Sequence, residues 1–131
     1  MAVAVLDASV VIAFLDPGDP THQAAGAALR EILAEHEVVL PASALAEVLV
    51  GAYGRGRDAV ATVDGFVAEV GIRIEPVTAR IARRAAQLRA RQARLRLPDA
   101  LVLATGEVIE AATIVTADRA WRGKVPRVRI V

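Results

Sequence analysis

The chain has 131 residues, no cysteine and a formal net charge of +1, with 16 Lys and Arg against 15 Asp and Glu. This length predicts one domain, spanning 1–131, whose core can be stable without covalent cross-links. Because cysteine is absent, disulfide frameworks, thiolate zinc sites and cysteine nucleophiles are all excluded.

The spacing of apolar residues and turn signals predicts strands that alternate with helices. In chain order, strands are expected at 2–6, 38–40, 72–74, 113–116 and 128–131, and helices at 10–15, 22–36, 43–53, 58–70, 78–95 and 98–111. Thr78 is the expected N-cap of the fifth helix, and Pro98 fits the first turn of the sixth. This alternation predicts an α/β fold with a central parallel sheet flanked by helices.

The apolar stretch at the start, residues 2–15, predicts neither a membrane span nor a signal peptide. It is shorter than the ~20 residues of a spanning helix, and it contains Asp7 and Ser9. No Lys or Arg precedes Arg30, whereas a signal peptide begins with positive charge. We therefore expect a cytoplasmic protein with no membrane partner.

Four acidic residues stand alone among apolar or uncharged neighbours. Three of them have a structural explanation when taken singly: Asp7 as a helix N-cap, Asp99 as a first-turn acid, and Asp118 as a turn residue. Glu47 has no such explanation, because it lies within a predicted helix among apolar residues.

The predicted topology brings these acids to one edge of the sheet, because two follow parallel strands and two lie on helices that can reach that edge. Two carboxylates about 4 Å apart repel by about 1 kcal/mol in water, and by several times that at a partly buried surface. Clustered acids therefore hold either a proton or a hard cation. Oxygen donors favour Mg²⁺ or Mn²⁺, which activate water for attack on a phosphoryl group.

The order of motifs resembles a known family, the PIN domains. The motifs are LDAS at 6–9, a single helical acid at Glu47, PDALVLATGE at 98–107 and TAD at 116–118. The likeness covers essentially the whole chain and is strongest to the small VapC toxins of bacterial toxin–antitoxin pairs. Two departures are minor: Trp121 replaces a more usual Phe, and Gly106 a more usual Ala.

This resemblance implies a metal-dependent endoribonuclease that cleaves RNA by attack of water, with Mg²⁺ or Mn²⁺ as cofactor. The family's four acidic positions fall on Asp7, Glu47, Asp99 and Asp118, and its small hydroxyl positions fall on Ser9 and Thr116. Asp7 and Asp99 are expected to bind the metal directly, with Asp118 completing the site or acting through water. Glu47 is expected to bind through water or to orient the attacking water. The two hydroxyls are expected to hold carboxylates or bound waters in place.

Positive charge is concentrated in the second part of the chain. Residues 1–79 contain 4 Lys and Arg against 11 Asp and Glu, whereas residues 80–131 contain 12 against 4. Five arginines of the fifth predicted helix share one face at helical spacing, and they repel one another without an acid between them. Contact with RNA phosphates is slightly favoured over a solvated face, with docking of an acidic partner as another use. These arginines are Arg80, Arg83, Arg84, Arg91 and Arg94.

The resemblance also implies protein partners. VapC-like toxins pair with a small VapB-type antitoxin, whose tail lies over the active-site groove. Apolar surface on the alanine- and valine-rich helices between residues 42 and 70 would suit that antitoxin or a homodimer.

Two other functions compete with the ribonuclease hypothesis. An aspartyl-nucleophile phosphatase would use Asp7 with Lys124 as its cation, although it would prefer a second acid where Ser9 stands. A non-catalytic interaction module would have no need of four isolated acids.

Overall fold

The computed structural model describes residues 1–121 and 127–131, and its centre is a five-stranded, wholly parallel sheet in the order β3-β2-β1-β4-β5. This confirms the predicted α/β class and parallel sheet. The strands are β1 (Ala2–Leu6), β2 (His36–Pro41), β3 (Arg73–Glu75), β4 (Thr113–Thr116) and β5 (Val128–Ile130). The helices are α1 (Ala8–Leu15), α2 (His22–Glu35), α3 (Ala42–Arg55), α4 (Arg57–Val70), α5 (Ala79–Arg91) and α6 (Leu97–Val108), with a short 3₁₀ turn at Arg119–Trp121.

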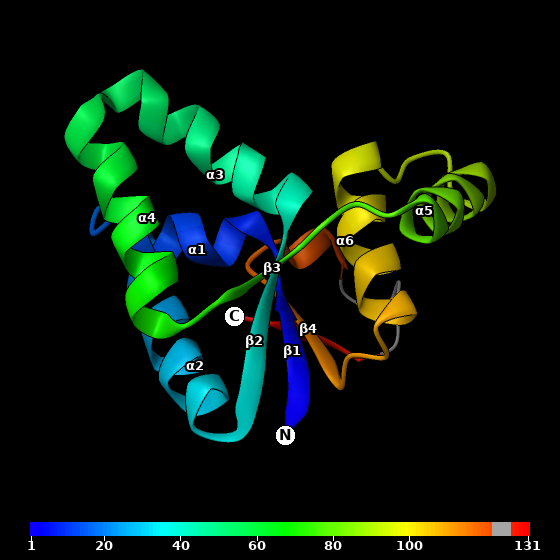
Figure 1. The fold of residues 1–131 in the computed structure, drawn as a ribbon, viewed down its shortest axis with the longest axis horizontal. Helices are drawn as coiled ribbons and strands as arrows, with labels where there is room; N and C mark the ends of the chain where they lie inside the picture. The colour runs from blue at the N-terminus through cyan, green and yellow to red at the C-terminus, as the bar shows by residue number, and fades with distance from the viewer. Residues whose placement is uncertain (122–126) are drawn as a thin grey trace.

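Helices lie on both sides of the sheet (Figure 1). Helices α1, α2 and α4 lie on one side, and α5 and α6 lie on the other, while α3 starts near the upper ends of the strands and runs outward to α4. The central strand β1 is covered on both faces, so that Ala4, Val5 and Leu6 have no exposed surface. A parallel strand covered in this way reads as a continuous apolar run, which is why residues 2–6 were predictable as a buried strand.

The register of the strands explains how the site is assembled. Leu6 of β1 lies level with Val115 of β4, and the backbone N–H of Asp7 donates to the carbonyl of Val115 at 2.9 Å. On the other side, Val5 lies level with Val39 of β2. Asp7, the end of β4 and the start of α3 therefore meet at the carboxyl edge of the sheet.

Most predicted boundaries agree with the structure to within a few residues, and the predicted strands 2–6 and 113–116 agree in full. The cap of α5 is also as predicted, since the Thr78 hydroxyl accepts a hydrogen bond from the N–H of Ile81 at 3.2 Å. Gly56, at the end of α3, has φ +118, a conformation that favours glycine.

The prediction that α5 continues to Leu95 is wrong, because the helix ends at Arg91. The next residues form a turn in which the N–H of Leu95 donates to Gln92 O at 2.9 Å. Arg89 holds this turn by donating from Nε to Leu95 O at 3.0 Å, and the Leu95 side chain is buried. The turn reverses the chain, so that α6 packs against α5.

Helix α6 also ends earlier than predicted, at Val108 rather than Ala111. The chain leaves it through Glu110, which has φ 56 in the left-handed region. No helix in the described part of the chain is long and apolar enough to cross a membrane.

Candidate active site

One hollow at the carboxyl edge of the sheet is lined by all four isolated acids. Asp7 follows β1, Glu47 lies in α3, and Asp99 lies in the first turn of α6. Asp118 completes the set two residues after β4. The hollow has a volume of about 390 Å³, and we call it the acid cleft. Four separate segments of the chain thus place carboxylates around one space.

Asp7 is the most buried of the four and is held by two hydroxyl groups. Its Oδ2 accepts hydrogen bonds from Ser9 Oγ at 2.6 Å and from Thr116 Oγ1 at 2.9 Å. Each hydroxyl oxygen in turn accepts a backbone N–H, from Ala117 at 2.9 Å for Ser9 and from Asp118 at 3.0 Å for Thr116. These N–H donors direct both hydroxyl hydrogens onto Asp7, which fixes the orientation of its carboxylate.

The simpler explanation of Asp7 as a helix cap fails on geometry. Asp7 occupies the N-cap position of α1, but its side chain makes no capping hydrogen bond. Its Oδ2 is used by the two hydroxyls, whereas Oδ1 receives no hydrogen bond from the residues that the structure describes. Asp118 does behave as a turn residue, since its Oδ1 accepts from the N–H of Ala120 at 2.9 Å.

Glu47 and Asp99 are the two acids of the cleft whose carboxyl pKa values are raised. Burial raises the pKa of Glu47 above its usual value of 4.5, and the negative charges of Asp7 and Asp99 raise it further. Burial likewise raises the pKa of Asp99, with smaller upward contributions from two neighbouring acids, while Arg96 lowers it. Both carboxyls therefore hold protons more tightly than in water, as expected where like charges lack a counter-ion.

Arg96 also lines the acid cleft, although it is not among the site residues predicted from the sequence. It is the residue before α6, and its Nε lies 3.4 Å from Asp99 Oδ2. Its charge also lowers the pKa of Glu47. The available signal was its spacing of three residues from Asp99, which places the two side chains on one side of a helix start.

The donor set of the acid cleft suits a hard divalent cation. Among the described residues, its polar lining consists of carboxylate and hydroxyl oxygens and the guanidinium of Arg96. Burial and mutual repulsion of the acids favour binding of a positive ion between them. Within the described ranges, no three His, Cys, Asp or Glu side chains converge closely enough to surround one ion as they stand. The lining residues thus suit a divalent cation by their chemistry, and in this structure Asp99 is paired with Arg96.

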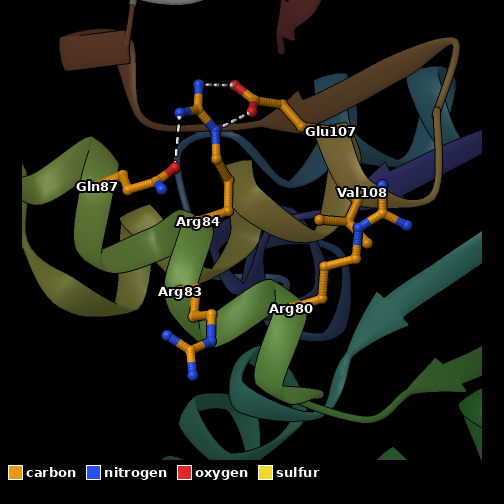
Figure 2. Close-up of a pocket in the computed structure, with 6 residues that line it drawn as sticks. All are labelled: Arg80, Arg83, Arg84, Gln87, Glu107 and Val108. Carbon is orange, nitrogen blue, oxygen red and sulfur yellow. Dashed lines mark hydrogen bonds and ion pairs between the residues drawn. The ribbon is translucent and has the colours of Figure 1, made fainter.

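Three of the five predicted arginines lie around a second hollow, between α5 and α6, with a volume of about 320 Å³. We call it the arginine hollow, and it is lined by Arg80, Arg83, Arg84, Gln87, Glu107 and Val108. Figure 2 shows Arg84 reaching from α5 to Glu107 on α6, with Gln87 beside it, and Arg83 pointing away from that pair.

The single arginine stripe predicted for α5 is wrong in one respect. Because the helix ends at Arg91, Arg94 lies in the following turn and cannot belong to a helical stripe. It lines instead a smaller hollow of about 150 Å³ that adjoins the acid cleft and shares Arg96, Asp99 and Asp118 with it. Arg91 is exposed at the end of α5 and does not line the arginine hollow.

The phosphatase alternative gains no support from this geometry. The hydroxyl of Ser9, where that alternative would prefer an acid, donates to Asp7. Lys124, its expected cation, lies outside the described residues.

A sequence profile of the PIN domain matches residues 4–124, and the chain therefore belongs to the PIN-domain family. A toxin–antitoxin complex from Klebsiella pneumoniae contains a similar fold, with a TM-score of 0.78 and 23% identity over 96% of this chain and 95% of that one. VapC20 of Mycobacterium tuberculosis, described as a sarcin-ricin loop cleaving toxin, gives a TM-score of 0.76 and 20% identity over 92% and 94% of the two chains.

VapBC2 of Rickettsia felis, solved with a DNA fragment from its promoter, gives a TM-score of 0.79 at 14% identity, over 98% of this chain and 97% of that one. No curated protein sequence matches the chain significantly. At these identities the solved structures establish a shared fold.

Proposed function

We propose that this protein is a metal-dependent endoribonuclease and the toxin of a type II toxin–antitoxin pair. The observation that carries the proposal is the convergence of Asp7, Glu47, Asp99 and Asp118 on one cleft at the carboxyl edge of the sheet. Structural acids are normally paired with bases or exposed to solvent, whereas this cleft holds four acids and one loosely bound arginine.

The four acids have different parts in this proposal. Asp7 and Asp99 would bind Mg²⁺ or Mn²⁺ directly, with Asp118 binding it directly or through water. A bound divalent ion supplies a Lewis acid that lowers the pKa of water and offsets charge on the phosphoryl group. Glu47, on α3, lines the same cleft, and its raised pKa suits a group that accepts a proton from the attacking water.

Ser9 and Thr116 act on Asp7 rather than on the RNA. Their hydroxyls hold Oδ2 of Asp7 at 2.6 and 2.9 Å, which stops the carboxylate from rotating. A ligand that is already oriented loses less freedom when the ion binds. The hydroxyl-to-carboxylate network thus prepares the cleft for its cation.

Relatives of the same fold support the biological part of the proposal. One of them is described as cleaving the sarcin-ricin loop, and others were solved as toxin–antitoxin complexes. We infer that RNA is the substrate and that a VapB-type antitoxin is the cognate partner of this chain.

The surface of α3 and α4 suits a protein partner. Val50 and Tyr53 on α3 have 75% and 70% of their surface exposed, and Val50 lines the acid cleft together with Ile12 on α1. Tyr53 and Val60 also line a hollow of about 570 Å³ between α3 and α4. This apolar surface would accept the antitoxin, and α3 and α4 would also support a homodimer. Light scattering of the toxin with and without its antitoxin measures both states.

The decisive experiment treats total RNA with the purified protein in Mg²⁺ or Mn²⁺, alongside Asp7→Asn and Asp99→Asn. Asparagine keeps the shape and removes the charge, so both variants are expected to lose RNA cleavage by about 10³-fold or more. Asp64→Asn, a change on the exposed surface of α4, is the matched control and is expected to cleave as the wild type does.

Three results would count against the proposal. Cleavage by both variants at the wild-type rate would exclude the acid cleft as the active site. Cleavage that persists in EDTA would exclude metal dependence. A phosphorylated Asp7, trapped from a phosphate ester without RNA cleavage, would favour the phosphatase instead.

A further inference from the structure

Arg96 lies among the acids of the cleft, and the proposed metal site gives this arginine no role. It is the last residue before α6 and lines both the acid cleft and the adjoining hollow of about 150 Å³. Within the part of the chain that the structure describes, it is the only basic side chain on the wall of the acid cleft. A single positive charge therefore faces four carboxylates.

The pairing between Arg96 and Asp99 is loose. The distance from Nε to Oδ2 is 3.4 Å, longer than the 2.7–2.9 Å of a strong charge-assisted hydrogen bond. By comparison, Arg129 Nη2 lies 2.7 Å from Glu31 Oε2. The Arg96 side chain is 72% exposed, whereas that of Asp99 is 14% exposed. The Asp99 carboxylate is thus largely enclosed by the cleft wall, whereas most of the Arg96 side chain is in contact with solvent.

Arg96 also partly substitutes for a cation. Its charge lowers the pKa of both Glu47 and Asp99, against the burial and mutual repulsion that raise those pKa values. Because a guanidinium keeps its proton in proteins, Arg96 can release the acids only by moving and never by deprotonation. A metal ion bound by Asp99 would supply the positive charge that this arginine now supplies.

We propose that Arg96 exchanges partners during the reaction, from the carboxylate of Asp99 to the scissile phosphate of the RNA. This inference rests on the proposed ribonuclease function. Before metal binds, Arg96 neutralises Asp99 and competes with the cation. Once the cation occupies the acids, the released guanidinium contacts the non-bridging oxygens of the phosphate, for which its planar pair of N–H donors is well suited. Arg96 is then a catalytic residue.

The proposal predicts two opposite effects of one substitution. In Arg96→Gln, the competing charge is gone, so Mn²⁺ alone should bind the RNA-free protein more tightly, by on the order of threefold to tenfold. In the same variant kcat for RNA cleavage should fall by about 10²-fold with little change in KM, because a donor to the transition-state charge is lost. A merely structural arginine would not raise metal affinity while lowering kcat.

Two further variants sharpen the test. Arg96→Lys keeps the charge, so its Mn²⁺ affinity should stay near that of the wild type, while its kcat should be only partly restored because ammonium lacks the planar pair of donors. Arg30→Gln removes the same charge from an exposed side chain on α2, which lines neither the acid cleft nor the hollow beside it. It should change neither Mn²⁺ affinity nor kcat by more than about twofold.

The measurements are Mn²⁺ titration by electron paramagnetic resonance without RNA, and steady-state cleavage of one RNA substrate with Mn²⁺ saturating. Unchanged or weaker Mn²⁺ binding by Arg96→Gln overturns the competition, as does an equal gain in Arg30→Gln. A rise in KM with kcat unchanged overturns the contact with the scissile phosphate. If the wild type cleaves no RNA, the proposed function and the phosphate contact fail together, whereas the Mn²⁺ titration still decides the competition.

Discussion

The two ends of α6 carry opposite charge arrangements. Near its start, Asp99 lies in a cleft with three other acids and one loosely bound arginine. Eight residues later, and about 12 Å along the helix, Glu107 lies among three arginines, one of which it binds. In the acid cleft the one positive charge, Arg96, is exposed and loosely paired, whereas in the arginine hollow the one negative charge, Glu107, is held by a close ion pair.

This difference indicates which of the two clusters is the better candidate for catalysis. The acids are half-buried or buried and repel one another, so their arrangement costs folding free energy unless a cation joins them. Arg80 and Arg83 are exposed, and water screens their repulsion. We therefore expect substitutions in the acid cleft to change the rate of cleavage, and substitutions in the arginine hollow to change RNA binding weakly.

The largest effect among the remaining predictions is for Thr116, which is completely buried and donates to Asp7. Thr116→Val keeps the shape and removes the hydroxyl, so cleavage should fall by roughly 10- to 100-fold. Thr105→Val is the matched control, because Thr105 is equally buried but donates to Leu101 O within α6. Equal losses of cleavage in the two variants would show that the hydrogen bond from Thr116 to Asp7 does not contribute to cleavage.

The second prediction concerns the packing that holds both ends of α6 in place. A Cβ at Gly106 would lie 2.5 Å from Cδ1 and 2.7 Å from Cγ1 of Ile114 on β4. Gly106→Ala should therefore lower the free energy of unfolding by about 1–3 kcal/mol, although alanine normally stabilises a helix. At Gly65 in α4 nothing lies within 4 Å of the added Cβ, so Gly65→Ala should stabilise by about 0.5–1 kcal/mol.

Denaturant unfolding measures both glycine variants. Adding Ile114→Val to Gly106→Ala removes Cδ1, so the double variant should lose less stability than the sum of the two single changes. Strict additivity would mean that the close approach of α6 to β4 does not limit residue 106.

The third prediction is a dependence of stability on pH in EDTA. Because the folded-state pKa of Glu47 is raised above 4.5, the folded protein binds a proton more tightly than the unfolded chain does. The contribution of Glu47 is thus favourable at low pH, and stability is lost as pH rises from 4.5 through the raised pKa. Glu47→Gln should remove this loss and stabilise the metal-free protein at pH 7 by up to about 1 kcal/mol.

Thermal unfolding across pH 4–8, with and without Mg²⁺, measures this effect. Saturating Mg²⁺ should stabilise the wild type more than Glu47→Gln and reverse their order, because the ion then uses the charge that was unfavourable. If the wild type is more stable than Glu47→Gln in EDTA at pH 7, the charge of Glu47 does not destabilise the metal-free protein.

The smallest effect is expected in the arginine hollow. Arg80→Gln with Arg83→Gln removes two exposed charges that have no ion pair among the described residues. RNA binding should weaken a few-fold at low salt, and the slope of log affinity against log salt should fall by about 0.7 for each lost phosphate contact. Arg84→Gln with Glu107→Gln removes a bound pair without changing net charge, and it should leave the slope unchanged. Equal slopes in all these proteins would exclude the hollow from RNA contact.

The sequence alone predicted the parts of this protein that depend on local interactions. The strands at 2–6 and 113–116, the Thr78 cap and the isolation of the four acids were all readable from neighbouring residues. The parallel sheet followed from their alternation with helices. These features depend on periodicity and short-range hydrogen bonds, which need no knowledge of distant contacts.

Only the tertiary structure decided how those parts work together. The strand register places Thr116 against Asp7 across 109 positions of sequence, and so turns a candidate cap into an oriented carboxylate. The turn after Arg91 separates Arg94 from the helical arginines and sends Arg96 into the acid cleft. Burial and the distance between charges set the pKa values and the pairing, and both quantities exist only once separate segments have packed against one another.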